Sequence, residues 1–306
     1  MATTRLSAEV ERLKRDRDAV VLAHYYVPAE TQGLADYVGD SFYLARLART
    51  LDHQVIVLCG VSFMAESAKM LNPTRTVLLP DPTADCPMAH MVRKSDVDAA
   101  REHYDDLAVV CYINSTAEVK SWSDVCVTSS NAVKVVRALP QTNILFIPDR
   151  HLGHYVSQQV PEKNFVFVDG YCPIHHAMSA AEVTLLKQEH PDAVVVAHPE
   201  CGEAVLAQAD FIGSTKDMIE HVAASNAREF IVLTVEGVRW EMERKTAGTG
   251  KRFYFPVTTP ICADMARVTP EKLLACLRDN TGEVPMPTNA LAATTPLERM
   301  LELAAQ

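Results

Sequence analysis

The sequence predicts an α/β protein of three repeated α/β/α units with parallel sheets, arranged as a pseudo-threefold triangle around one central site. The first observation behind this is a repeat, since three similar apolar runs end at His24, Tyr112 and His198, 88 and 86 positions apart. The second is that short apolar runs alternate with amphipathic stretches, which is typical of parallel strands buried on both faces. The third is that 48% of the 306 residues are hydrophobic, which suits a large core and excludes a disordered chain.

Each unit of about 85–90 residues is expected to contain helix, strand, helix, short strand, helix, strand, helix and strand, in that order. The four strands are expected to begin near residues 20, 36, 54 and 75, near 108, 124, 143 and 163, and near 194, 210, 229 and 251. Ahead of the second and third units, Ser95-x-x-Asp98 and Ser179-x-x-Glu182 have the pattern of helix capping boxes. The alternative is that the periodicity arose by chance, but four separate elements recur with the same spacing in the three units.

The repeat divides the chain into units at residues 1–94, 95–178 and 179–268. It ends after residue 268, and residues 269–306 are expected to form a C-terminal helical cap of two helices, joined by a link that contains Pro285 and Pro287. We expect this cap to pack back on the first unit.

Composition excludes several functional classes. The net charge of −10, without a basic stripe, argues against nucleic acid as a partner. No apolar run approaches the ~18–20 residues of a membrane helix, and the polar N-terminal stretch lacks the apolar segment of a secretory signal. We therefore expect a cytoplasmic protein with reduced thiols and no membrane partner. Glycine-rich nucleotide loops are missing from the sequence, so binding of NAD or ATP is not expected.

Three of the eight cysteines occupy equivalent places, after the fourth predicted strand of each unit. These are Cys86, Cys172 and Cys262, 86 and 90 positions apart. Ligands of parallel α/β units bind beyond the carboxyl ends of the strands, so three such loops around a pseudo-threefold axis would bring the three thiols together. Four other cysteines fall within strand or helix patterns and are interpreted as buried small hydrophobes: Cys59, Cys111, Cys126 and Cys276. The role of Cys201, in His-Pro-Glu-Cys, is left open.

Three converging thiolates favour an iron–sulfur cluster over structural zinc, because structural zinc takes four ligands, usually as two close pairs. A [4Fe–4S] cluster held by three cysteines leaves one iron without a protein ligand, and this iron can act as a Lewis acid. The alternative is that these three cysteines, too, are only buried apolar residues.

Polar side chains follow the first predicted strand of each unit. They are His24, Tyr25 and Tyr26 in the first unit, Tyr112, Asn114, Ser115 and Thr116 in the second, and His198 and Glu200 in the third. Imidazole, phenol and carboxylate groups together can transfer protons in enolisation, dehydration or imine chemistry. A single strand-end histidine would be interpreted as structural, but three polar clusters at equivalent positions indicate a site.

Hydroxyl residues begin the helix after each short second strand. These are Ser41, Ser129, and Ser214 with Thr215. Each is a candidate helix N-cap, and a helix N-terminus offers free N–H groups to an anion. Three such termini directed at one centre would bind a phosphate or several carboxylates, in spite of the net charge. His175, three residues after Cys172, either faces the substrate or supports the cysteine loop.

Over nearly its whole length the chain resembles the quinolinate synthases, the NadA-type enzymes of NAD biosynthesis. Together the motifs are highly specific. They are His24-Tyr25-Tyr26, Gly39-Asp40-Ser41, Gly60-Val61-x-Phe63-Met64-Ala65-Glu66-x-Ala68-Lys69, Tyr112-x-Asn114-Ser115-Thr116-Ala117-Glu118, Thr128-Ser129-x-Asn131-Ala132, Pro148-Asp149-x-x-Leu152, His198-Pro199-Glu200-Cys201 and Ser214-Thr215.

The resemblance implies an enzyme that condenses iminoaspartate with dihydroxyacetone phosphate to quinolinate, releasing phosphate and two waters. It implies a [4Fe–4S] cluster held by Cys86, Cys172 and Cys262, with the fourth iron binding substrate atoms. The implied catalytic residues are Glu200, Tyr112, His198, Tyr26 and His24, of which Glu200 and Tyr112 are the first choices for proton transfer. The implied substrate-binding residues are His24, Tyr26, Ser41, Tyr112, Asn114, Ser129, His175, His198, Glu200, Ser214 and Thr215.

The sequence departs from part of the family at one place. Some members carry Cys-x-x-Cys-x-x-Cys near the last ligand, whereas the stretch Pro256–Cys262 contains a single cysteine, which puts a thiol–disulfide switch there in doubt. The expected partners are the two small-molecule substrates and the enzyme that supplies iminoaspartate, and the expected assembly is a monomer or homodimer. Two other classes remain: a zinc-dependent lyase or hydrolase using His24, His198, Glu200 and a thiolate, and a non-catalytic metabolite-binding or redox-sensing protein.

Replacing Cys86, Cys172 or Cys262 by alanine is expected to abolish the cluster, because each would supply one of its three protein ligands. Cys59→Ala is the matched control and should retain it. Iron and sulfide analysis of anaerobically purified protein measures the outcome. A cluster that survives the loss of one of the three cysteines would refute the ligand assignment.

Overall fold

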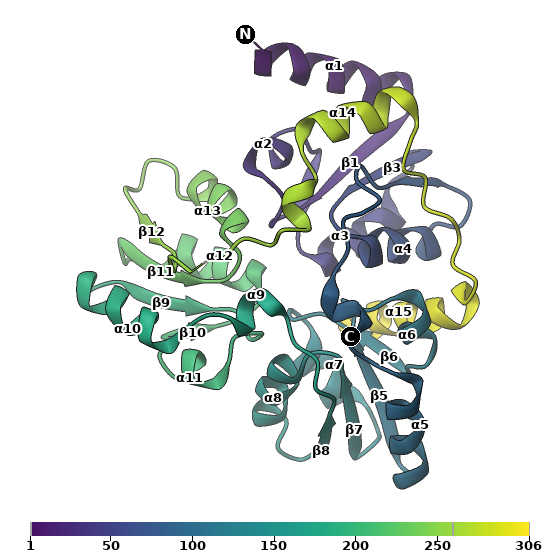
Figure 1. The fold of residues 1–306 in the computed structure, drawn as a ribbon, viewed down its shortest axis with the longest axis vertical. Coiled ribbons are helices and arrows are strands. Elements are labelled where there is room, and N and C mark those ends of the chain that lie inside the picture. The colour runs from purple at the N-terminus through teal and green to yellow at the C-terminus, as the bar shows by residue number, and fades with distance from the viewer. Residues whose placement is uncertain (1, 259, 306) are drawn as a thin grey trace.

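The computed structural model describes residues 2–258 and 260–305, and within them the chain forms three four-stranded parallel sheets. The strand orders are β2-β1-β3-β4, β6-β5-β7-β8 and β10-β9-β11-β12, so one order occurs three times. This repetition confirms the expected fold class. Figure 1 shows the three sheets with their helices at the corners of a triangle, with α9 (Pro173–His176) near its centre.

The elements follow the predicted order in each unit. The first contains α1 (Ala2–Asp16), β1 (Ala19–His24), α2 (Ala29–Gln32), β2 (Tyr37–Gly39), α3 (Ser41–Thr50), β3 (Val55–Cys59), α4 (Ser62–Leu71) and β4 (Thr76–Leu78). The second contains α5 (Lys94–His103), β5 (Leu107–Tyr112), α6 (Ala117–Ser121), β6 (Val125–Val127), α7 (Ala132–Ala138), β7 (Asn143–Ile147), α8 (Arg150–Gln159) and β8 (Asn164–Phe167). The third contains α10 (Ala180–Glu189), β9 (Val194–Ala197), α11 (Glu203–Leu206), β10 (Phe211–Ile212), α12 (Thr215–Ala224), β11 (Glu229–Leu233), α13 (Arg239–Lys245) and β12 (Arg252–Tyr254).

Single turns of 3-10 helix and two further helices complete the chain. The turns are η1 (Pro87–His90), η2 (Glu236–Val238) and η3 (Met265–Arg267), and the helices are α14 (Pro270–Asp279) and α15 (Ala290–Ala305). None of the helices in the described ranges is long and apolar enough to cross a membrane. Thr259, in the stretch before Cys262, lies outside the described residues, as do Met1 and Gln306 at the ends of the predicted first unit and cap.

The first and third strands of each sheet stop together, which determines where polar residues emerge. Their last paired residues are Ala23 with Cys59, Cys111 with Ile147, and Ala197 with Leu233. An aspartate precedes the second strand of each unit. These residues, Asp36, Asp124 and Asp210, accept hydrogen bonds from backbone N–H groups of β1, β5 and β9 at 2.7–2.8 Å. The residues that follow the strands therefore leave each sheet at its carboxyl edge, where ligands of parallel sheets bind.

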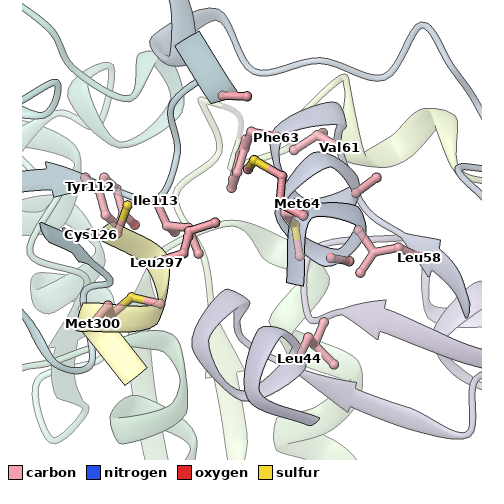
Figure 2. Close-up of a cluster of buried hydrophobic side chains, with 14 of the residues drawn as sticks. Leu44, Leu58, Val61, Phe63, Met64, Tyr112, Ile113, Cys126, Leu297 and Met300 are labelled. Atoms are coloured by element: carbon pink, nitrogen blue, oxygen red, sulfur yellow. The ribbon is translucent and has the colours of Figure 1, made fainter. Parts of the chain in front are cut away.

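The three units do not share one core equally. One continuous apolar cluster runs through the first and second units and includes residues of α14 and α15. The third unit has two further clusters, one of which also contains Tyr25 of the first unit. Figure 2 shows part of the shared core, with Leu297 and Met300 of α15 on the side of Ile113 and Cys126. The third unit is therefore joined to the other two mainly through contacts outside the large core.

The expectation that the cap packs on the first unit is correct for α14 and only partly correct for α15. Helix α14 contacts α1 and α2, whereas α15 packs mainly against α6 and β6 of the second unit and also against α4 of the first and α7 of the second. The reason is the apolar stripe Ala293, Leu297 and Met300, all fully buried, which closes the gap between the first two units.

The two predicted capping boxes are also wrong. Helix α5 begins after Arg93, whose backbone N–H donates to Asp96, so Ser95 lies inside the helix. Ser179 does cap α10, but its side chain makes no capping hydrogen bond. Glu182 instead accepts from the N–H of Thr258 at 3.0 Å and is bonded to Val257, because the loop after β12 competes for its carboxylate.

We keep the division at residues 94, 178 and 268 as a proposal. One sheet falls within each unit, and α14 and α15 follow the third, which supports this division.

Leu297→Ala should lower the free energy of unfolding by about 2–5 kcal/mol, because the substitution leaves a cavity in the core shared by two units. Leu291→Ala, on the same helix but 90% exposed, is the matched control and should change it by less than about 0.5 kcal/mol. Denaturant titration measures both. Equal effects of the two substitutions would show that α15 is not part of the core.

Candidate active site

A small cavity of about 50 Å³ lies where residues of all three units meet. Nine of the predicted site residues line it: His24, Tyr26, Ser41, Tyr112, Asn114, Ser129, His198, Glu200 and Thr215. Each follows the first or second strand of its sheet, so the shared carboxyl edges explain why distant segments meet here. His175 and Ser214 do not line the cavity but are buried behind it.

Glu200 is the electrostatic centre of this site. Its Oε2 lies 2.8 Å from Nδ1 of His175 and 3.3 Å from Nδ1 of His198, and all three side chains are buried. Burial alone would raise the pKa of Glu200, but the two imidazoles outweigh it and hold the pKa well below its ordinary value. Glu200 is therefore a carboxylate at neutral pH. Its Oε1 has no hydrogen-bond partner among the described residues, which leaves this oxygen available to a ligand.

His175 joins the carboxylate to two other parts of the site. Its Nδ1 also lies 3.2 Å from Sγ of Cys172, and its Nε2 lies 2.9 Å from Oγ1 of Thr234. The Thr234 hydroxyl is in turn hydrogen-bonded at 2.7 Å to the hydroxyl of Tyr26. Thr234 is fully buried at the carboxyl end of β11, and through it the third unit positions groups from the other two.

Burial keeps the phenols and His24 neutral. It raises the pKa of Tyr26 and of Tyr112 well above the ordinary value, and the charge of Glu200 raises both further. It lowers the pKa of His24 to about 3. The backbone N–H of Tyr26 donates to Nδ1 of His24 at 3.2 Å, so the ring proton of His24 lies on Nε2. The cavity thus combines the Glu200 carboxylate with neutral groups that can donate a proton.

Of the hydroxyl residues expected as helix N-caps, Ser214 is one and Ser41 and Ser129 are not. Ser214 caps α12, and its hydroxyl donates to Asp217 at 2.6 Å. The N-caps of α3 and α7 are instead Asp40 and Asn131, which stand beside the predicted Ser41 and Ser129. An N-cap hydroxyl accepts a hydrogen bond from an N–H group of its own helix. A hydroxyl at N1, or one that precedes the N-cap, does not have this role and can contact a ligand instead.

Two of these hydroxyls contact the acid–base groups directly. Ser129 Oγ lies 3.1 Å from Nε2 of His198, and Thr215 Oγ1 lies 2.7 Å from the Tyr26 hydroxyl. These contacts link the predicted binding residues to the predicted catalytic ones across two unit boundaries.

The three loop cysteines stand apart from the other five. Cys86, Cys172 and Cys262 are partly exposed, while the remaining cysteines are buried. Burial raises the pKa of Cys86, and negative charge on Cys262 and Glu200 raises it further. The pKa of Cys172 is raised by burial, then by Glu200 and Cys86. Burial and the charge of Glu200 raise the pKa of all three thiols, so a cation bound among them would favour their thiolate forms.

Cys172, His175 and Glu200 form the tightest group of possible metal ligands in the described chain. Their ligand atoms lie within 4.8 Å of one another. Backbone hydrogen bonds hold two of the cysteine loops, since the N–H of Cys172 donates to Asp149 and that of Cys86 donates to Asp85.

Sequence reasoning missed part of the site. Asp40, Phe63, Thr128 and Met265 also line the cavity. The sequence did not single out Thr234, because the apolar run that begins at Glu229 continues through it to Val235. Its signal is its position, since it is the first residue after β11, at the same carboxyl edge as the other site residues.

Fold and cavity define an α/β enzyme whose site is shared by three repeated units. The family model described as quinolinate synthetase A protein matches residues 8–302. The quinolinate synthase of Fusobacterium nucleatum is 47% identical over 296 residues, covering 96% of this chain and 98% of the relative. That of Caldicellulosiruptor saccharolyticus is 43% identical over 304 residues, covering 99% and 100%. That of Aquifex aeolicus is 42% identical over 304 residues, covering 97% and 94%. The chain belongs to the quinolinate synthase family, which confirms the resemblance drawn from the motifs.

Thr234→Val should lower the free energy of unfolding by about 1–3 kcal/mol, because it leaves Nε2 of His175 without its hydrogen-bond partner and removes one of the two partners of the Tyr26 hydroxyl. Thr234→Ser keeps the hydroxyl and is the matched control. Denaturant titration compares the two variants. A Thr234→Val protein as stable as the serine variant would contradict the bridging role of this hydroxyl.

Proposed function

We propose that this chain condenses iminoaspartate with dihydroxyacetone phosphate to quinolinate, with loss of phosphate and water, at the cavity around Glu200. The observation that carries the proposal is the buried carboxylate between two imidazoles and beside the thiol of Cys172, in a chain of this family. The product supplies the pyridine ring of NAD biosynthesis.

The residues present fit a [4Fe–4S] cluster held by Cys86, Cys172 and Cys262. The fit rests on the thiols themselves, because their mutual repulsion and that of Glu200 would be relieved by positive charge at this point. When bound, such a cluster supplies an open iron that acts as a Lewis acid. His175 would then hold both the Cys172 loop and the Glu200 carboxylate in place.

Glu200 and Tyr112 are the proposed proton-transfer residues. The free Oε1 of Glu200 is the base, because the pKa of Glu200 keeps the group ionised. Tyr112 stays protonated and can donate a hydrogen bond to a substrate oxygen. His24, Tyr26 and His198 would orient the substrates, and Ser41, Asn114, Ser129 and Thr215 would bind phosphate and carboxylate groups.

Substrate binding requires the cavity to enlarge. Its volume of about 50 Å³ is far below the roughly 300–1,000 Å³ of small-molecule sites. The third unit, which contributes Glu200, His198 and Thr215, has most of its buried apolar side chains in two clusters separate from the large core. We propose that movement of this unit admits the substrates.

The same proposal includes a functional link to the enzyme that supplies iminoaspartate and a location in the cytoplasm. Eight cysteines, none of them paired in the described residues, support a reducing compartment.

Zinc is the second candidate for the metal, because Cys172, His175 and Glu200 would suit one zinc ion with an open position. It would make the site a zinc-dependent lyase or hydrolase. Metal analysis separates the two candidates, since only the cluster brings sulfide.

Anaerobic protein supplied with both substrates should form quinolinate, and Glu200→Gln should lower kcat at least 100-fold because the base is lost. Glu203→Gln, an exposed residue on α11, is the matched control and should retain activity. Quinolinate is measured by chromatography. No product from wild-type protein with a full iron and sulfide content would refute the function, and full activity of Glu200→Gln would refute the base.

A further inference from the structure

Lys120 is a buried cation that the proposed chemistry does not use. It lies on α6, and 0% of its surface is exposed. It does not line the cavity. Burial lowers its pKa, and the nearby Cys126, Cys111 and Glu66 oppose this. An ammonium group is costly to bury, so the charge of Lys120 must be stabilised by its neighbours.

The first contact is with the loop that carries Asn114. The Lys120 ammonium donates to the carbonyl oxygen of Ser115, next to Asn114. The Ser115 hydroxyl donates to the carbonyl of Tyr112 at 2.9 Å, and the Ser115 N–H donates to the carbonyl of Ile113 at 2.8 Å. These bonds close a tight turn, and the hydrogen bond from the Lys120 ammonium to the Ser115 carbonyl stabilises this turn. Both Tyr112 and Asn114 present side chains to the cavity.

The second contact reaches into the first unit. The ammonium nitrogen lies 5.4 Å from the centre of the Phe63 ring, within the range of a cation–π contact. Phe63 lies on α4 and lines the same cavity as Tyr112 and Asn114 of the second unit. One turn further along α4, Glu66 accepts from the N–H of Ala117 at 3.1 Å, at the start of α6. One side chain therefore contacts two walls of the cavity that belong to different units.

We infer that Lys120 is a positioning residue that fixes Asn114 and Phe63 relative to each other across the boundary between the first two units. This deepens the proposed function, because it assigns the geometry of the substrate-binding wall to a residue outside the cavity. An apolar side chain of the same length would fill the space, but it would leave the Ser115 carbonyl unbonded and the ring without its cation.

Two variants and one control test the inference in the whole protein. Lys120→Met keeps the length and removes the donors, whereas Lys120→Gln keeps one donor. Lys134→Met makes the same chemical change on α7, at an exposed lysine bonded to the carbonyl of Ala304. Amide hydrogen exchange of residues 112–117 is measured first, because it requires neither cluster nor turnover.

Lys120→Met should speed exchange of the amides of residues 112–117 at least tenfold and should raise KM for one or both substrates at least tenfold, with a smaller change in kcat. Lys120→Gln should fall between Lys120→Met and wild type, and Lys134→Met should match wild type. A purely structural role predicts a smaller folded fraction, which lowers apparent kcat and leaves KM unchanged.

Unchanged exchange together with KM within twofold of wild type would overturn the inference. Failure of both Lys120 variants to fold would also overturn it, because Lys120 would then hold the fold and not the site. A wild-type protein that makes no quinolinate would count against the proposed function alone, since the exchange measurement stands without it.

Discussion

The pairing of Glu200 with His175 and His198 is the interaction on which the rest of the site depends. A buried carboxylate is costly unless it is paired, and here two imidazoles compensate it within 3.3 Å. His175 comes from the Cys172 loop and His198 from the end of β9, so the pairing ties the second unit to the third. Thr234 extends the network to Tyr26 of the first unit. The same contacts that stabilise the charge thus assemble the site.

Much of this could be predicted from the sequence because the repeat carries positional information. Equivalent strands leave their sheets at equivalent edges, so His24, Tyr112 and His198 had to emerge on the same side of their units. The repeat also singled out three cysteines among eight. The aspartates at positions 36, 124 and 210, which repeated with the same step, prove to be structural acceptors for the first strands.

Other features depend on packing between segments far apart in the chain. The docking of α15 on the second unit follows from a complementary apolar surface that periodicity alone does not assign to a partner. The capping of α10 was also predicted incorrectly, because Glu182 accepts hydrogen bonds from a loop about 75 residues further along the chain. The bridging role of Thr234 requires three side chains from three units, and a pattern within one unit cannot show it.

The unequal cores relate the fold to its proposed function. The first two units share one apolar cluster, which Lys120, Glu66 and α15 reinforce at their boundary, and they form a fixed wall. The third unit contributes Glu200, and its apolar side chains lie mostly in two separate clusters, one of which it shares with Tyr25 of the first unit. This arrangement suits a site that must admit two substrates and then exclude water.

The central claim is that three thiols and Glu200 converge on one iron–sulfur cluster. An anomalous-scattering map at the iron edge, from crystals grown without oxygen, tests it most directly. The account predicts one group of iron peaks that would be held by Cys86, Cys172 and Cys262. A single metal ion held by Cys172, His175 and Glu200, or iron bound to other cysteines, would contradict it.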